Sequence, residues 1–183
     1  VYNGRLVDLV RISSEKITDE NVAELLAPCD AVVIAPGFGS RGIPGKLTAI
    51  RYCREHDVPT LGICLGMQCI CIEIARDMLG LEQANSTEFD SQSPDPVIDL
   101  MEEQKEVNML GGTMRLGSYE CELAEGSKAA QIYGTETIRE RHRHRYEFNS
   151  KYEQAFEEAG VLIAGRNPET GLVEVVELPD KQW

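Results

Sequence analysis

Thr60-Leu61-Gly62-Ile63-Cys64-Leu65-Gly66-Met67-Gln68 is the stretch of sequence that decides the fold, because a short apolar run passes directly into a helical pattern. Cys64 stands at the junction, with one glycine two residues before it and another two residues after it. This is the spacing of a nucleophile elbow, a turn so tight that the neighbouring positions have no room for a Cβ atom. The segment therefore predicts a strand over 60–63, a helix over 65–79 and a thiol at the carboxyl end of a sheet, where ligands bind in open α/β folds.

The position of Cys64 also indicates its chemistry. A thiol at a helix N-terminus lies where the helix dipole favours the thiolate, and the free backbone N–H groups there can stabilise a developing oxyanion. The alternative is that Cys64 is a small buried hydrophobic residue, which is the interpretation we favour for Cys69 and Cys71 in the apolar helix that follows. The paired glycines favour the nucleophile.

The residues before the elbow extend the same pattern. Ala31–Ala35 is an unbroken apolar run, typical of a strand covered on both faces, and it leads into a glycine-rich loop at 36–42. A helix is expected through Leu47, Ile50 and Cys53, and the patterns further upstream predict a strand over Val7–Ile12 and a helix within Ser14–Leu26. The order β-α-β-α predicts an α/β fold with a doubly wound, mostly parallel sheet and helices on both faces.

The second half of the chain has a different pattern. A proline-containing loop over Phe89–Pro96 precedes expected elements that are short and less regular: a helix over Val97–Gln104, a strand over Thr113–Leu123, helices over Lys128–Tyr133 and Tyr152–Ala159, and a hairpin formed by Val161–Arg166 and Leu172–Leu178. We expect these elements to form a small antiparallel lobe attached to the same domain.

Composition limits the class of protein. The 183 residues are enough for one domain, and the 42% of hydrophobic residues are enough for one core. With 31 acidic and 18 basic residues the formal charge is −13, which argues against nucleic acid and anionic membranes as partners. The chain has no apolar run of membrane-spanning length, and its first residues, Val1-Tyr2-Asn3-Gly4, are too polar for a secretory leader. Its six cysteines match neither a disulfide framework nor a zinc site. We therefore expect free thiols, no metal and a cytoplasmic location.

One basic segment stands out in this acidic chain. Residues 139–145 contain four of the eighteen basic residues and two of the three histidines. In an extended strand, the alternation places Arg141, Arg143 and Arg145 on one face, and His142 and His144 on the other. Two interpretations stay open: a site for an anion, or a strand that forms salt bridges with the many acidic residues.

These residues together resemble a known family. The elbow Gly62–Gln68 is similar to that of the class I (triad) glutamine amidotransferases, and the resemblance to the glutaminase domains of the CTP synthases runs nearly end to end. It is carried by Gly37–Gly42, Gly62–Gln68, Asn85–Phe89, Pro96–Leu100, Glu103–Val107, Leu110–Gly117 and Glu140–Glu147. The runs Gly111-Gly112-Thr113-Met114-Arg115-Leu116-Gly117 and Arg141-His142-Arg143-His144-Arg145-Tyr146-Glu147 are its most specific parts.

The resemblance implies a role for each matching residue. Cys64 would attack the side-chain amide of L-glutamine and form a thioester, and the amides of Gly37 and Leu65 would form the oxyanion hole and contact the substrate. Gln68, Glu88 and Arg145 would also hold the glutamine: a carboxylate suits its α-ammonium group, and a guanidinium suits its α-carboxylate. Without the resemblance, Glu88 is a solvated loop acid and Gln68 a helix-surface residue. The chain departs from the family at Pro36, where a glycine is common and which has no N–H to donate.

The resemblance also implies partners. The ammonia would pass to an N-terminal synthase domain of the same polypeptide, where it converts UTP to CTP. The ATP, magnesium and UTP sites would lie on that domain, so this domain itself would need no cofactor or metal. GTP is implied as an allosteric activator that acts near residues 139–145, and the full-length protein is implied to be a homotetramer.

A cysteine hydrolase also needs a base, and the chain offers His56, His142 and His144. His56 precedes the amino end of the elbow strand, which is the wrong end of the sheet, and none of the three matches the family's catalytic histidine. In the family that histidine belongs to a His-Pro-Glu motif just after the run matched by Val173–Trp183. We therefore expect residues 1–183 to be a glutaminase domain trimmed at both ends, with little activity by itself. The alternatives are a non-catalytic amidotransferase-like regulatory module, or another cysteine hydrolase of this fold, such as a γ-glutamyl hydrolase or a DJ-1-like thiol protein.

Overall fold

The first half of the chain builds a parallel strand pair with two long helices. The structure is a computed structural model, and it describes residues 4–100 and 115–183. Its first elements are η1 (Ser14–Lys16), α1 (Val22–Leu26), β1 (Val32–Ile34), α2 (Ile43–Glu55), β2 (Thr60–Gly62) and α3 (Leu65–Asp77). Strands β1 and β2 pair in parallel, from Val32 opposite Thr60 to Ile34 opposite Gly62. This confirms the alternation of strands and helices and the parallel pairing beside the elbow.

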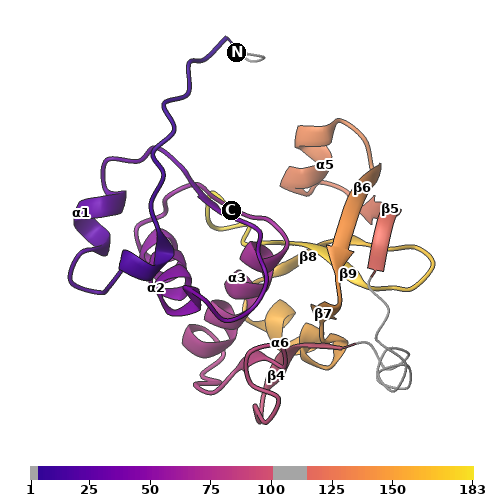
Figure 1. Cartoon of the computed structure of the whole chain (residues 1–183). Helices are drawn as coiled ribbons and strands as arrows, with labels where there is room; N and C mark the ends of the chain where they lie inside the picture. The colour runs from indigo at the N-terminus through magenta and orange to yellow at the C-terminus, as the bar shows by residue number, and fades with distance from the viewer. Residues whose placement is uncertain (1–3, 101–114) are drawn as a thin grey trace.

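The second half adds two further sheets. Its elements are β3 (Asn85–Ser86), β4 (Pro96–Leu100), β5 (Arg115–Leu123), α5 (Lys128–Tyr133), β6 (Thr137–His144), β7 (Tyr146–Phe148), η3 (Ser150–Tyr152), α6 (Glu153–Glu158), β8 (Leu162–Arg166) and β9 (Val173–Glu177). One sheet has the order β3-β4-β7, and the other is a four-stranded antiparallel sheet with the order β6-β5-β8-β9. In Figure 1 the four-stranded sheet and α5 lie to one side, away from α1 and α2. The antiparallel lobe is thus confirmed.

Helix α3 lies at the centre of the main core. Almost every side chain of α3 is buried, including Cys69 and Cys71, which confirms that these two cysteines are core residues. The core continues through residues of both halves, such as Ile50, Val97, Ile98, Phe148 and Phe156. Because the elbow turn leads directly into this buried helix, Cys64 lies beside the main core.

The helix expected over Val97–Gln104 is wrong for the residues that the structure describes. Residues 96–100 form strand β4, which pairs with β3 on one side and β7 on the other. The structure does not describe the remainder of the expected helix, nor the first two residues of the strand expected over Thr113–Leu123. Val97 and Ile98 are both fully buried. A strand buried on both faces has no alternating pattern, and a short apolar run of this kind does not distinguish strand from helix.

The expected elements at the start of the chain also differ from the structure. Residues 5–13 form no strand, and the segment within Ser14–Leu26 divides into η1 and the short helix α1. The side chain of Asn21 explains the interruption: its Oδ1 accepts a hydrogen bond from the Thr18 N–H and its Nδ2 donates to the Lys16 carbonyl. Such local side-chain bonds compete with the helical backbone pattern.

Strand β1 is covered on one face only in the described structure. Ile34 is buried against the core, whereas Val33 and its neighbour Leu61 on β2 are more than half exposed. The expectation of burial on both faces is therefore wrong for this strand pair. Helices α2 and α3 pack against these strands, and the exposed side chains alternate with those in the core.

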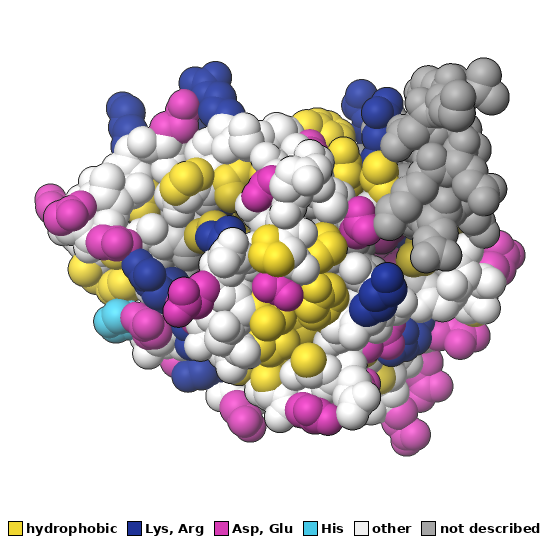
Figure 2. All heavy atoms as spheres, turned by 90° about the horizontal axis from the view of Figure 1, so that it is seen from below, with side chains coloured by type: hydrophobic (Ala, Val, Ile, Leu, Met, Phe, Trp, Pro, Cys, Tyr) yellow, Lys and Arg dark blue, Asp and Glu magenta, His cyan; other side chains and the backbone are white. Residues whose placement is uncertain are grey.

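The surface is mainly acidic (Figure 2), and the cysteines are unpaired, as expected from the sequence. In the view from below, acidic side chains lie around the edge of the molecule with fewer basic ones between them (Figure 2). All six cysteines lie within the described residues and are free thiols. Within residues 4–100 and 115–183, no helix is long and apolar enough to span a membrane, and no cluster of His, Cys, Asp or Glu could hold a metal ion.

Candidate active site

The elbow has the geometry that its glycines predict. Cys64 is the N-cap of α3, and it is one of two described non-glycine residues with positive φ, at φ 55° and ψ −111°. A Cβ on Gly66 would lie 2.0 Å from the carbonyl oxygen of Ile34, and a Cβ on Gly62 would lie 2.7 Å from the carbonyl carbon of Gly66. Only glycine fits these two positions, and Cys64 between them has the strained backbone of a tight strand-to-helix turn.

Cys64 opens into a cavity of about 330 Å³. The cavity is lined by Gly37, Phe38, Cys64, Gln68, Glu88, Arg143, His144, Arg145 and Tyr146. The structure thus brings together five of the six residues predicted for the site, although they come from four separate segments of the sequence. The sixth, Leu65, is buried behind the elbow, but its backbone amide faces the sulfur.

The surroundings of Cys64 have opposing effects on the pKa of its thiol. Burial raises the pKa of the Cys64 thiol, while hydrogen bonds from the Leu65 and Gly37 backbone amides lower it, and the carboxylates of Glu88 and Glu147 raise it again. The net shift is upward. The thiolate that the helix N-terminus was expected to favour is therefore disfavoured overall in this structure, because desolvation outweighs the two amides. The same two amides are those predicted to form the oxyanion hole.

Two of the predicted residues tie the cavity together. Glu88 Oε1 accepts a hydrogen bond from the backbone N–H of Gly39, at 2.7 Å, and thereby fixes the glycine-rich loop. Gln68 is buried, and its Nε2 donates to the carbonyl oxygen of Tyr146, at 2.9 Å, which connects α3 to the start of β7. Glu88 is thus bonded to the loop rather than free in solvent, and Gln68 is not a helix-surface residue.

The basic segment contributes more to the cavity than the sequence indicated. On β6 the side chains alternate as expected: Arg141 and Arg143 are exposed, and His142 and His144 are mostly buried. Arg143 also lies with its guanidinium carbon 5.8 Å from the centre of the Phe38 ring, which joins the segment to the glycine-rich loop. Arg143 and His144, from the basic segment considered as an anion site, line the cavity, whereas Phe38 and Tyr146 are cavity residues that the sequence reasoning missed, although each is adjacent to a residue it selected.

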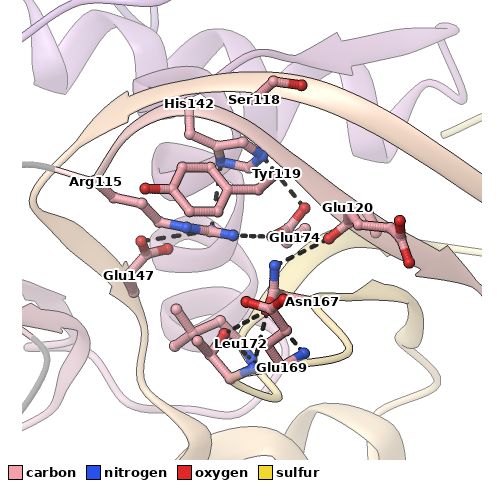
Figure 3. Close-up of polar contacts among 12 residues, drawn as sticks. Arg115, Ser118, Tyr119, Glu120, His142, Glu147, Asn167, Glu169, Leu172 and Glu174 are labelled. Atoms are coloured by element: carbon pink, nitrogen blue, oxygen red, sulfur yellow. Dashed lines mark hydrogen bonds and ion pairs between the residues drawn. The ribbon is translucent and has the colours of Figure 1, made fainter.

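Behind this segment lies a network of charged side chains. Arg115 forms ion pairs with Glu174 and, at 3.8 Å, with Glu147, and His142 lies 3.2 Å from Glu174 (Figure 3). The open choice for the basic segment is therefore answered in part: its buried face forms salt bridges, while its exposed face carries arginines toward the cavity mouth. His56 takes no part, since it stacks on Tyr52 at the exposed end of α2.

Comparison with known proteins identifies the family. The chain belongs to the class I glutamine amidotransferases, whose family model, Glutamine amidotransferase class-I, matches residues 2–183. Within that class the chain is similar to CTP synthases. The chain is 59% identical over 183 residues to the CTP synthase of Porphyromonas gingivalis and 58% identical over 182 residues to that of Bacteroides thetaiotaomicron, and it spans 34% of the length of each.

A solved structure agrees with this assignment. The glutaminase domain of Trypanosoma brucei CTPS with bound acivicin matches with a TM-score of 0.92 at 33% sequence identity. The match covers 100% of this chain and 72% of that one. The α/β fold of a class I amidotransferase is thereby confirmed for the chain, together with its membership of the CTP synthase glutaminase domains.

Proposed function

We propose that the cavity binds L-glutamine and that Cys64 hydrolyses its side-chain amide. The observation that carries the proposal is the meeting of a strained elbow cysteine, two backbone amides facing its sulfur, and an acidic and a basic side chain in one cavity. Glu88 would pair with the α-ammonium group and Arg145 with the α-carboxylate, which places the side-chain amide over Cys64. The glutamine analogue acivicin, bound in the Trypanosoma brucei domain, supports this class of ligand.

In the proposed mechanism the sulfur of Cys64 forms a bond to the amide carbon of glutamine. The resulting oxyanion accepts hydrogen bonds from the amides of Gly37 and Leu65, and the C–N bond then breaks to release ammonia. Water attacks the γ-glutamyl thioester, glutamate leaves, and the thiol is restored. Pro36 contributes no N–H, so the two donors to the oxyanion are those on either side of the sulfur, Gly37 and Leu65.

The attack needs a base, because the raised pKa of Cys64 keeps the thiol protonated at neutral pH. His142 and His144 are not assigned to this role, since their ring nitrogens contact each other and the carboxylates of Glu147 and Glu174. His56 lies on the exposed end of α2. The proposal therefore rests on Cys64, the two amides and the substrate contacts.

We further propose that the chain is the glutaminase domain of a longer cytoplasmic CTP synthase. The ammonia would pass to a synthase domain of the same polypeptide, which binds ATP, magnesium and UTP and makes CTP. GTP activation and a homotetramer would belong to that full-length protein, and the glutaminase domain itself would need no cofactor. The identity to CTP synthases along the whole chain supports this proposal.

The test is covalent labelling of the full-length protein with a chloroketone analogue of glutamine, followed by peptide mass spectrometry. We expect modification of Cys64, protection by free L-glutamine, and loss of glutamine-dependent ammonia release in the Cys64→Ala variant. Labelling of Cys64 without protection by glutamine would instead indicate a thiol protein of another specificity. Absence of both labelling and ammonia release would indicate a non-catalytic module.

A further inference from the structure

Arg145 lies at a one-residue junction between two sheets. Strand β6 ends at His144 in the four-stranded sheet, and β7 begins at Tyr146 in the sheet with the order β3-β4-β7. The backbone bends at Arg145, and this residue lines the cavity together with Cys64. The position of the Arg145 side chain therefore depends on how the two sheets are held together at this junction.

Arg115 joins the two sheets beside the junction. It lies on β5, and its guanidinium donates a hydrogen bond to the carboxylate of Glu174 on β9, within the four-stranded sheet. Its Nη1 also lies 3.8 Å from Oε1 of Glu147, which belongs to β7 of the other sheet. Figure 3 shows the guanidinium between these two carboxylates. One side chain thus contacts acidic residues of both sheets.

The guanidinium of Arg115 is held in this position by the packing of β5 on β6. In their antiparallel register Arg115 lies opposite His144, and Gly117 lies opposite His142. Tyr119 is two positions beyond Gly117 on the same face of the sheet, and its ring covers the guanidinium, with Arg115 Cζ 4.3 Å from the ring centre. The guanidinium therefore has an aromatic ring on one face and carboxylates at its N–H groups.

Burial makes this bridge strong. The side chains of Arg115, Glu147 and Glu174 are 5%, 6% and 3% exposed, so water screens their charges only weakly. Without the guanidinium, two buried carboxylates would lose a shared counter-charge, and their repulsion would favour separation of β7 from β9, which pack against each other. Arginine suits this place because its planar group donates in several directions, whereas a lysine ammonium is a compact point charge.

The bridge reaches both sides of Arg145. On one side, His144 pairs with Arg115 across β5 and β6; on the other, Glu147 forms the ion pair with Arg115. The remaining attachment of the junction is Tyr146, whose carbonyl oxygen accepts a hydrogen bond from Gln68 Nε2 on α3, at 2.9 Å. Gln68 therefore fixes the junction to the helix that follows Cys64, and Arg115 fixes it to the four-stranded sheet.

We propose that Arg115 is a positioning residue for glutamine recognition: by bridging Glu147 and Glu174 it holds Arg145 where its guanidinium meets the α-carboxylate of the substrate. The inference rests on the proposed function, because the contact between Arg145 and the α-carboxylate is part of that function. Arg115 is not one of the described residues that line the cavity, so it acts through Arg145 and does not touch the substrate.

The test is steady-state glutamine hydrolysis by the full-length protein, with Arg115→Lys, Arg145→Gln and the double variant, and with folding checked by circular dichroism. Lysine keeps the buried positive charge but cannot bridge two carboxylates as arginine does. We expect Arg115→Lys to raise KM for glutamine by about 5- to 20-fold and to leave kcat within about threefold, because a substrate contact moves while the reacting atoms do not.

The double variant shows whether Arg115 acts through Arg145. Arg145→Gln alone should raise KM by about 10- to 100-fold, the cost of one charge-assisted hydrogen bond. Adding Arg115→Lys to it should raise KM by less than about twofold more, because the contact that Arg115 positions is already lost. A residue that only stabilises the fold would instead give the same factor in both backgrounds.

Two controls separate positioning from general loss of stability. Arg166→Lys is the matched variant, because Arg166 on β8 of the same sheet makes two hydrogen bonds to the carboxylate of Glu153, away from the cavity. It should leave KM within about twofold of the wild type. Alkylation of Cys64 by iodoacetamide does not use the α-carboxylate site, so its rate in Arg115→Lys should also stay within about twofold.

The outcomes are distinct. An unchanged KM in folded Arg115→Lys, the full additional factor in the double variant, or slower alkylation of Cys64 together with a lower kcat would overturn the proposal. Should Arg115→Lys fail to fold, Glu147→Gln decides, since it keeps the pair of Arg115 with Glu174 and removes the charge on β7; an unchanged KM in Glu147→Gln contradicts the proposal. Failure of the proposed function would show in the wild type as absent glutamine hydrolysis, whereas failure of this inference shows only in the variants.

Discussion

Glu88 Oε1 accepts the backbone N–H of Gly39 at 2.7 Å, a contact between residues 49 positions apart in the chain. The carboxylate proposed to bind the α-ammonium group of glutamine therefore also braces the loop that carries Gly37. In the proposed function, substrate recognition and placement of an oxyanion donor would therefore depend on the same side chain. A variant that keeps the acceptor oxygen but removes the charge can separate the two roles.

Glu88→Gln and Glu88→Ala should therefore differ in a defined way. Both remove the charge that pairs with the α-ammonium group, so both should raise KM for glutamine by about 10- to 100-fold, the cost of one charge-assisted hydrogen bond. Only alanine removes the acceptor for Gly39, so only alanine should also lower kcat. Steady-state ammonia release by the full-length protein measures both constants. Equal kcat values for the two variants would show that the brace has no catalytic effect.

The strained backbone at Cys64 predicts that replacing this residue by glycine makes the fold more stable while abolishing activity. Cys64 has φ 55°, a region that L-residues rarely adopt, so Cys64→Gly should relieve strain and stabilise the protein by about 1 kcal/mol relative to Cys64→Ala. Both variants should lose glutamine hydrolysis. Calorimetric unfolding of the two variants side by side is the measurement, and a more stable alanine variant would show that the elbow stores no strain at this position.

The close packing of Gly66 predicts a large loss of stability on a minimal change. Its Cβ in Gly66→Ala would lie 2.0 Å from the Ile34 carbonyl oxygen, so α3 and β1 must separate, at a cost of about 2–4 kcal/mol. Gly37→Ala is the matched control, because its Cβ would meet only the flexible tip of Leu65, at 3.1 Å. Urea denaturation gives both values. A cost below 1 kcal/mol for Gly66→Ala would mean that the strand and helix can move apart freely.

The elbow could be predicted from the sequence because its constraints are local. Gly62, Cys64 and Gly66 lie within five residues, and this spacing alone indicates a turn that has no room for a Cβ atom beside the cysteine. The resemblance then supplied Gly37, Gln68, Glu88 and Arg145, which the structure places around the same cavity as Cys64. The hydrogen bond between Glu88 and Gly39 joins residues 49 positions apart, and no repeating pattern in a single sequence predicts such a contact.

Elements that depend on tertiary contacts were the ones that could not be predicted. Val97 and Ile98 of β4 point to opposite faces of the sheet and are both fully buried, so this apolar pair also suits a buried helix. Arg115 and Glu174 are 59 residues apart and meet only because β5, β8 and β9 pair in one sheet. The alternation predicted for Arg141–Arg145 is confirmed, but the partners of its buried face come from three other strands, β5, β7 and β9, which no local pattern identifies.

The buried ion pair of Glu174 predicts a specific acid dependence of stability. Burial acts to raise the pKa of the Glu174 carboxyl, but hydrogen bonds and charges from His142 and Arg115 outweigh it, and the pKa is lowered below 4.5. A carboxyl whose pKa is lower in the folded than in the unfolded state stabilises the fold above the unfolded pKa, and this contribution is lost as the pH falls through the folded pKa. Glu174→Gln does not titrate and leaves Arg115 with one partner fewer, so it should cost about 3 kcal/mol at pH 7.

The difference in unfolding free energy between the wild type and Glu174→Gln should therefore be constant above about pH 5 and shrink steadily as the pH falls below 4.5. Urea denaturation from pH 3 to pH 8 measures this difference directly. Glu169→Gln, at the exposed turn between β8 and β9, should show no such pH-dependent difference from the wild type. A difference that stays constant to pH 3, or that grows as the pH falls, would show that Glu174 is not held as a carboxylate by Arg115 and His142.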